Sequence, residues 1–273
     1  MSEFSASDFA ALQDAVRRLE SRNFAVVLAS KVGVPIEALL HLLPKKAQAH
    51  IGTVVEKSLQ QCLRVAINIG KTSTTSASSK FKHNAATAVT GALGGFFGLA
   101  GLAIELPVTT TIMLHSIAAI ARSHGEDLSD PASALACMEV LALSPEGVRG
   151  RPVEGAYYAT RAALAQTIRE AATHITQRGL AGEGGPAVMS FLAKIAGRFG
   201  VEVSDKVAAQ LIPIAGAVGG LSLNVLFSHH FQSIAEGHFT VRRLERKYGV
   251  EAVRQAYEQA RGGKRRLSGL LKG

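Results

Sequence analysis

The chain has 273 residues, of which 47% are hydrophobic and 5% aromatic, and its formal net charge is +9. This length suffices for one large domain or two small ones, and the apolar content supports a sizeable core. The two cysteines, Cys62 and Cys137, lie far apart in helix-like sequence, which argues against a disulfide framework or a zinc site. No basic segment followed by an apolar stretch opens the chain, so we expect no signal peptide and an intracellular protein.

The N-terminal part of the chain is predicted to be helical. Apolar residues recur at helical spacing over residues 8–70, and no stretch alternates with the period of a strand. Pro35 and Pro44 each lie just inside the predicted start of a helix. A serine- and threonine-rich stretch at 72–79 is the best candidate for a hinge. Residues 1–71 are therefore predicted to form an N-terminal helical region.

Two segments without charged residues, 84–104 and 207–228, are the most unusual features of the sequence. Both contain the pattern Gly-Ala-aliphatic-Gly-Gly, at 91–95 and 216–220, and glycines four residues apart allow close approach of helix backbones. We predict an all-α, multi-helix bundle in which these two glycine-rich helices pair at the centre. Neither cluster has the Gly-Lys-Ser/Thr of a phosphate-binding loop or follows a strand, which excludes nucleotide-binding fingerprints. Both segments could span a bilayer in length, but their glycine content lowers their hydrophobicity and disfavours integral insertion.

Two apolar segments contain single polar residues that are candidates for function. Glu105 lies just before Pro107, the predicted first residue of a helix at 107–122, so its carboxylate should be mostly buried and face that helix N-terminus. In a structural role, Glu105 would pair with that helix N-terminus or with an arginine of the fold. In a functional role, it would be a buried carboxylate in a ligand pocket or a proton-sensitive switch. His115 in the same helix is predicted to be a core histidine. Asn224 is predicted to hydrogen-bond to a neighbouring helix.

A group of histidines near residue 230 resembles a metal site in composition but not in spacing. His230 and His238 are separated by about 12 Å along a helix, too far for one ion, and His229 points to another side. We therefore predict no metal and no cofactor. The motifs Gly-x-Ser-x-Gly and His-Glu-x-x-His are missing, and no catalytic residue is assigned. His229 and His230 remain candidates for ligand binding.

Basic residues are concentrated near the C-terminus. One group, at 242–247, lies on one predicted helix. A second group, at 264–266, lies beside leucines in a predicted tail, 262–273. Basic residues interleaved with leucines suit an anionic membrane surface, whereas scarce aromatics and the lack of a known motif argue against nucleic acid. The predicted membrane-surface residues are Arg242, Arg243, Arg246, Lys247, Lys264, Arg265 and Arg266.

Motifs in two parts of the chain resemble the EcsC family. The first part, 91–128, contains a glycine-rich apolar run, then Glu105-Leu106-Pro107, and finally Gly125-Glu126-Asp127-Leu128. The second contains Ile212-Pro213-Ile214-Ala215-Gly216-Ala217 and, further on, Lys247-Tyr248-Gly249. The family often has aspartate at the position of Glu105. The motifs span about residues 80–250, so an EcsC-like helical domain is predicted at 80–261.

The resemblance implies a bacterial protein related to one encoded beside an ABC transporter, and it implies no catalytic residues. Two functions are consistent with the sequence. The first is a non-enzymatic accessory protein, peripherally bound to the cytoplasmic leaflet or to a membrane protein complex for transport or secretion. The second is a soluble helical protein that encloses a lipid or other apolar ligand, with hydrolytic chemistry at Glu105 and the histidines as an option.

Overall fold

The structure is a computed structural model, and the prediction of an all-α, multi-helix bundle is confirmed. It describes residues 4–20, 24–32, 43–71, 98–144, 147–148, 151–152, 155–180, 185–210 and 220–270. In this part of the chain, the only extended structure is a two-residue antiparallel ladder between β1 (Gly147–Val148) and β2 (Arg151–Pro152).

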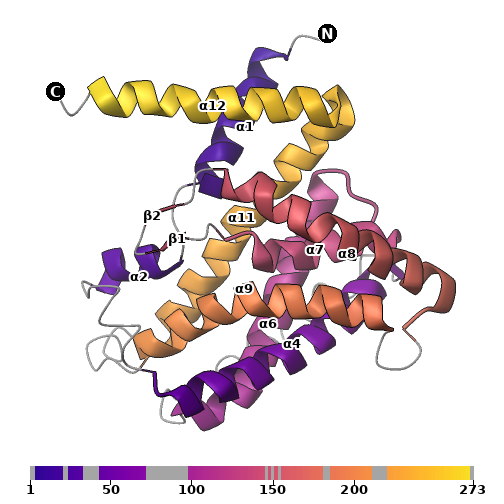
Figure 1. The fold of residues 1–273 in the computed structure, drawn as a ribbon, viewed down its shortest axis with the longest axis vertical. Helices are drawn as coiled ribbons and strands as arrows, with labels where there is room; N and C mark the ends of the chain where they lie inside the picture. The colour runs from indigo at the N-terminus through magenta and orange to yellow at the C-terminus, as the bar shows by residue number, and fades with distance from the viewer. Residues whose placement is uncertain are drawn as a thin grey trace.

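The helices follow one another along the chain and cross in layers (Figure 1). A 3-10 turn at Val140–Ala142 follows the helix Pro131–Glu139. The helices are α1 (Ala6–Glu20), α2 (Phe24–Val32), α4 (Lys45–Lys71), α6 (Gly98–Ser123), α7 (Pro131–Glu139), α8 (Ala156–Arg178), α9 (Pro186–Gln210), α11 (Gly220–Tyr248) and α12 (Val250–Leu270).

Several helix ends follow directly from local sequence. Helix α7 has a capped start: the Asp130 carboxylate accepts a hydrogen bond from the Ala132 N–H at 3.1 Å, and Pro131 occupies the first turn. Helix α8 ends at Gly179, which has φ of 66°. Gly249 has φ of 86° and makes the sharp turn between α11 and α12.

Two predicted helix boundaries are wrong. Helix α6 begins at Gly98 and continues through Pro107, so Glu105 lies inside the helix rather than at its N-terminus. A proline inside a helix removes one backbone hydrogen bond, and here the buried Leu106 before the proline and the buried Met113 after it hold both sides in the core. Helix α12 was expected to end before residue 262 but runs to Leu270, because glycine lowers helix propensity by only about 1 kcal/mol per residue.

Helix α11 connects the two ends of the bundle. It packs against α1 on one side and α6 on another, while α4 packs against α6, α7 and α9. One continuous hydrophobic core includes residues from α1 and α4 together with those of α6 to α12. The hinge predicted at 72–79 lies outside the described residues, and so do the glycine motif at 91–95 and all but the last residue of the motif at 216–220, so their predicted pairing lies outside them as well.

A close backbone approach that depends on glycine occurs between α1 and α11. A Cβ atom at Gly237 would lie 2.8 Å from Leu19 Cγ and 3.2 Å from the Ala15 carbonyl oxygen. Gly237 therefore lets the two helices touch. This contact was not predicted, because Gly237 is a single glycine in a polar part of a helix and does not belong to a repeated glycine motif.

Candidate functional site

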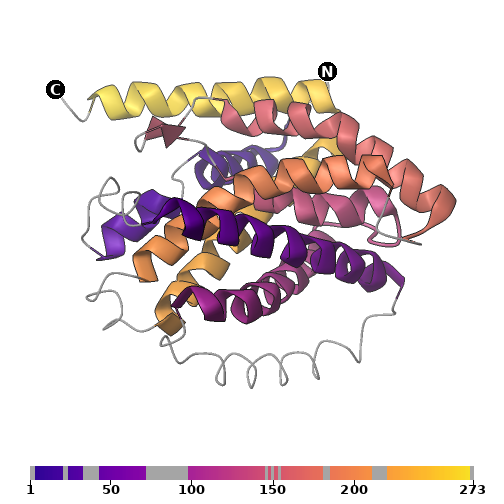
Figure 2. The same cartoon turned by 60° about the horizontal axis from the view of Figure 1, so that its bottom comes forward.

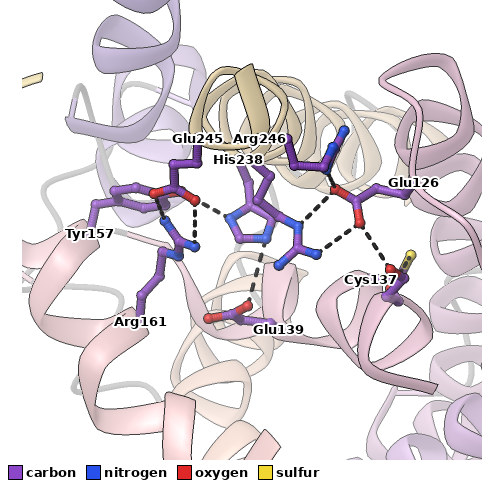
Figure 3. A network of polar contacts seen from close by, with 10 residues as sticks. Glu126, Cys137, Glu139, Tyr157, Arg161, His238, Glu245 and Arg246 are labelled. Atoms are coloured by element: carbon purple, nitrogen blue, oxygen red, sulfur yellow. Dashed lines mark hydrogen bonds and ion pairs between the residues drawn. The ribbon is translucent and has the colours of Figure 1, made fainter. Parts of the chain in front are cut away.

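Two clusters of polar side chains lie inside the bundle. The larger, which we call the α11 network, joins α11 to α7 and α8 and to the loop before α7 (Figure 3). The smaller, which we call the α9 cluster, lies where α9 meets α6, α11 and the start of α2. The α11 network consists of Glu126, Glu139, Tyr157, Arg161, His238, Arg242, Glu245 and Arg246.

At the centre of the α11 network, His238 lies between Tyr157 and Glu139 (Figure 3). The Tyr157 hydroxyl and His238 Nδ1 are 3.1 Å apart, and His238 Nε2 lies 3.6 Å from Glu139 Oε2. The second distance is too long for a hydrogen bond, and no described residue gives Nε2 one. Burial lowers the pKa of His238 and raises that of Glu139, so both groups favour their neutral forms.

Ion pairs flank this histidine on both sides. Arg161 donates to both carboxylate oxygens of Glu245, at 2.7 and 3.0 Å, and its guanidinium lies 5.4 Å from the Tyr157 ring centroid. Arg242 donates to both oxygens of Glu126, at 2.9 and 2.8 Å. These bidentate pairs connect α8 and the loop before α7 to the last turns of α11.

Glu126 is the most heavily bonded carboxylate of the network. Arg246 also donates to it, and the Ser133 hydroxyl donates at 3.0 Å. Burial alone would raise the pKa of Glu126, but the bonds and charges of Arg242 and Arg246 outweigh burial and lower it. The Glu126 side chain is only 2% exposed, so these contacts hold the fold and leave no room for a substrate.

A third carboxylate binds the remaining basic residues at the end of α11. Asp8 of α1 accepts from Lys247 at 2.7 Å, from the Tyr248 hydroxyl at 2.8 Å and from Arg243 at 3.3 Å. The hydrogen bond from Lys247, followed by that from Tyr248, holds the pKa of Asp8 well below its usual range. The predicted membrane-surface residues of this helix, Arg242, Arg243, Arg246 and Lys247, are therefore all paired with carboxylates of the fold. The structure does not describe the side chains of Lys264, Arg265 and Arg266.

The α9 cluster contains the partner of Glu105. The ammonium of Lys206 lies 2.7 Å from Glu105 Oε1 and 5.2 Å from the Phe227 ring centroid, and the Lys206 side chain is fully buried. Burial lowers the pKa of Lys206, and the charge of Glu105 opposes that effect. The carboxylate of Glu105 is mostly buried, as predicted, but its partner is a lysine and not an arginine or a helix end.

Glu202 and His230 form the other half of the α9 cluster. The Ser144 hydroxyl lies 3.1 Å from His230 Nε2, and Glu202 Oε2 lies 4.0 Å from the same nitrogen. No described residue hydrogen-bonds to Glu202 Oε2. Burial raises the pKa of Glu202 to about 7 and that of Asp205 to about 6, and it lowers the pKa of His230 to about 4.

This arrangement is not a serine–histidine–acid triad. In such a triad the acid binds the imidazole nitrogen opposite the serine, whereas here the serine and the acid approach the same nitrogen of His230. The three side chains are also buried under Phe24, whose N–H donates to Glu202 and whose ring centroid lies 5.5 Å from that of His230. The α9 cluster can bind and release protons but is closed to a substrate.

The other predicted candidates do not converge on one site. His229 is exposed while the side chain of His230 is buried, which confirms that the two point to different sides. His115 is half-buried, and burial lowers its pKa with a contribution from Arg122. The buried Asn224 Oδ1 has no hydrogen-bond partner among the residues that the structure describes.

Sequence reasoning missed most members of both clusters. One signal was present: Glu202 and Lys206 fall in phase with the apolar Ile195 and Phe199 on α9, so they occupy buried positions of that helix. The partners of the α11 network gave no comparable signal, because they come from segments far apart in the sequence. In the described ranges, no group of three or more histidine, cysteine, aspartate and glutamate side chains is arranged to hold a metal ion.

Comparison with known proteins gives one result. A family model described as the EcsC protein family matches residues 8–244, and this range includes α1 and α4, which the sequence motifs had left out. No curated protein and no solved structure matches the chain significantly. Because the matched range covers most of the chain, the protein belongs to the EcsC protein family.

Proposed function

We propose that the protein is a non-enzymatic accessory protein that binds peripherally to the cytoplasmic leaflet of a bacterial membrane, in association with a transport or secretion complex. The main support for this proposal is that α6 is strongly apolar but only partly buried. Within the described ranges, the segment Gly101–Ser123 is the one helix long and apolar enough to cross a bilayer, with a mean hydropathy of 1.4. Only 39% of its most apolar stretch is buried.

Five large hydrophobic residues are exposed in the described part of the chain: Ile104 on α6, Val225 on α11, Met189 and Val201 on α9, and Val250 on α12. Ile104 on α6 is 70% exposed and Val225 on α11 is 45% exposed. The N-terminal parts of these two helices lie side by side, because Lys206 contacts both Glu105 and Phe227. A large aliphatic side chain left in water gains about 1.5–3 kcal/mol when it enters an apolar phase, so a lipid surface would favour this end.

The polar clusters support a non-enzymatic role better than a catalytic one. Glu139 and His238 are 4% and 0% exposed, and the α9 cluster is covered by Phe24. Cys62 and Cys137 are buried, and burial raises the pKa of each thiol to about 12, which makes both poor nucleophiles. A ligand enclosed in the core has less support, since the groups expected to contact it lie in separate places.

A fluorescent probe at residue 104 tests this proposal. The protein with Ile104→Cys is labelled with a polarity-sensitive fluorophore, which reacts selectively because the two native thiols are buried. Val250→Cys supplies the matched control, since Val250 is 61% exposed at the start of α12, on the opposite side of the bundle. Addition of lipid vesicles should shift the emission of the probe at 104 to the blue and leave the probe at 250 unchanged.

A further inference from the structure

Helix α4 carries exposed cations without a carboxylate partner among the described residues, whereas the cations at the end of α11 are paired with carboxylates. Helix α4 has exposed basic side chains at four positions, which we call the α4 stripe: Lys45, Lys46, Lys57 and Arg64. Among the contacts of the described residues, no ion pair or hydrogen bond engages the three lysines. By contrast, the basic residues at the end of α11 are held by Asp8 and Glu126.

The α4 stripe is strongly positive for its length. Glu56 is the single acidic residue of α4. The face of α4 opposite the stripe is buried against α6 and α9 through residues such as Ile51 and Val55. Lys45 and Lys46 lie in the first turn, where the helix dipole disfavours cations, so the helix itself gains nothing from them.

Helix α4, which carries the stripe, is a neighbour of α6, which carries Ile104. The two helices pack against each other, and the guanidinium of Arg122 at the end of α6 donates to the Ile69 carbonyl at the end of α4, at 2.9 Å. In both ribbon views α4 and α6 lie on the lower face of the molecule, whereas α12 lies on the upper face (Figures 1 and 2). Neighbouring helices therefore carry the exposed cations of the α4 stripe and the exposed aliphatic residue Ile104.

We propose that this face binds a bilayer that contains anionic lipid, with the α4 stripe on the phosphate headgroups and the Ile104 end of α6 in the apolar layer beneath them. The inference rests on the proposed function and adds the class of lipid and the residues that select it. Cations beside exposed apolar side chains are the pattern of interfacial helices, in which charge attraction and apolar burial act together. Helix α12, on the opposite side of the bundle in Figures 1 and 2, lies away from the membrane in this orientation.

The test compares two variants that each lose three positive charges. The first is Lys45→Gln/Lys46→Gln/Lys57→Gln on α4, and the matched control is Lys264→Gln/Arg265→Gln/Arg266→Gln on α12. Each full-length protein is titrated with phosphatidylcholine vesicles and with vesicles that also contain phosphatidylglycerol, and co-sedimentation gives the Kd. The α4 substitutions are at exposed positions, and circular dichroism checks that both variants are folded.

We expect the α4 variant to bind the phosphatidylglycerol vesicles roughly 100-fold more weakly than the intact protein, from about 1 kcal/mol per basic residue. The α12 variant should lose much less, and the preference of the intact protein for anionic vesicles should weaken with salt. An α4 variant with the affinity of the intact protein would overturn the inference, while a blue shift of the probe at residue 104 would keep the proposed function. Equal losses in both variants would also overturn it, because binding would then follow net charge. If the intact protein binds neither vesicle, the proposed function fails as well.

Discussion

Replacement of Glu202 by glutamine should stabilise the protein at high pH. Burial raises the pKa of Glu202 from 4.5 to about 7, which means that the folded protein holds this proton more tightly than the unfolded chain does. The contribution of this tightly held proton to the free energy of unfolding is fully present below pH 4.5 and is lost as the pH rises through 7. The shift corresponds to about 3 kcal/mol at pH 8, from about 1.4 kcal/mol per pKa unit.

Glu202→Gln removes this loss because the amide never ionises. Urea unfolding followed by circular dichroism, at several pH values from 5 to 8, gives the free energies of unfolding. The difference between variant and wild type should grow with pH and level off above 7. Comparison with wild type cancels the titration of groups that lie far from Glu202. Glu170→Gln, at an exposed position of α8, is the control and should show no such growth.

Two results would refute the reasoning. A difference that stays constant from pH 5 to 8 would mean that the Glu202 carboxyl does not titrate in this range with a raised pKa. A variant less stable than wild type at pH 8 would mean that the ionised carboxylate has a partner that the amide cannot replace.

Two further predictions concern helix packing. Glu105→Leu leaves the buried Lys206 ammonium without its partner at 2.7 Å and should cost about 1–3 kcal/mol, and a thermal midpoint equal to that of wild type would contradict this. Gly237→Ala puts a Cβ atom 2.8 Å from Leu19 Cγ and should lower the free energy of unfolding, although alanine favours a helix. Gly197→Ala is its control, because nothing lies within 4 Å of a Cβ there, and this variant should be as stable as wild type or more so.

Much of the fold could be predicted because helix ends are coded locally. The Asp130-Pro131 start of α7 and the Gly179 end of α8 are set by capping and backbone conformation, which neighbouring residues determine. The passage of α6 through Pro107 could not be predicted in this way. It depends on burial of residues on both sides of the proline against other helices, and tertiary packing overrides local propensity.

The candidate sites could be predicted only in part. Glu105 is mostly buried as expected, but Lys206 follows it by 101 residues, and no local pattern identifies such a pair. The same holds for Asp8 and Lys247, whose contact joins the two ends of the chain. The basic run at the end of α11 had the composition of a membrane surface, and no local pattern indicated that each of its charges is paired with a carboxylate of the fold.

The emission of a fluorophore at residue 104 tests the central claim, membrane contact through α6, most directly. With Ile104→Cys labelled and vesicles containing phosphatidylglycerol added, the account predicts a blue shift that saturates with lipid, while the probe at Val250→Cys stays at its aqueous wavelength. An unchanged emission at 104, or equal shifts at both positions, would contradict the claim that this end of the bundle enters the bilayer.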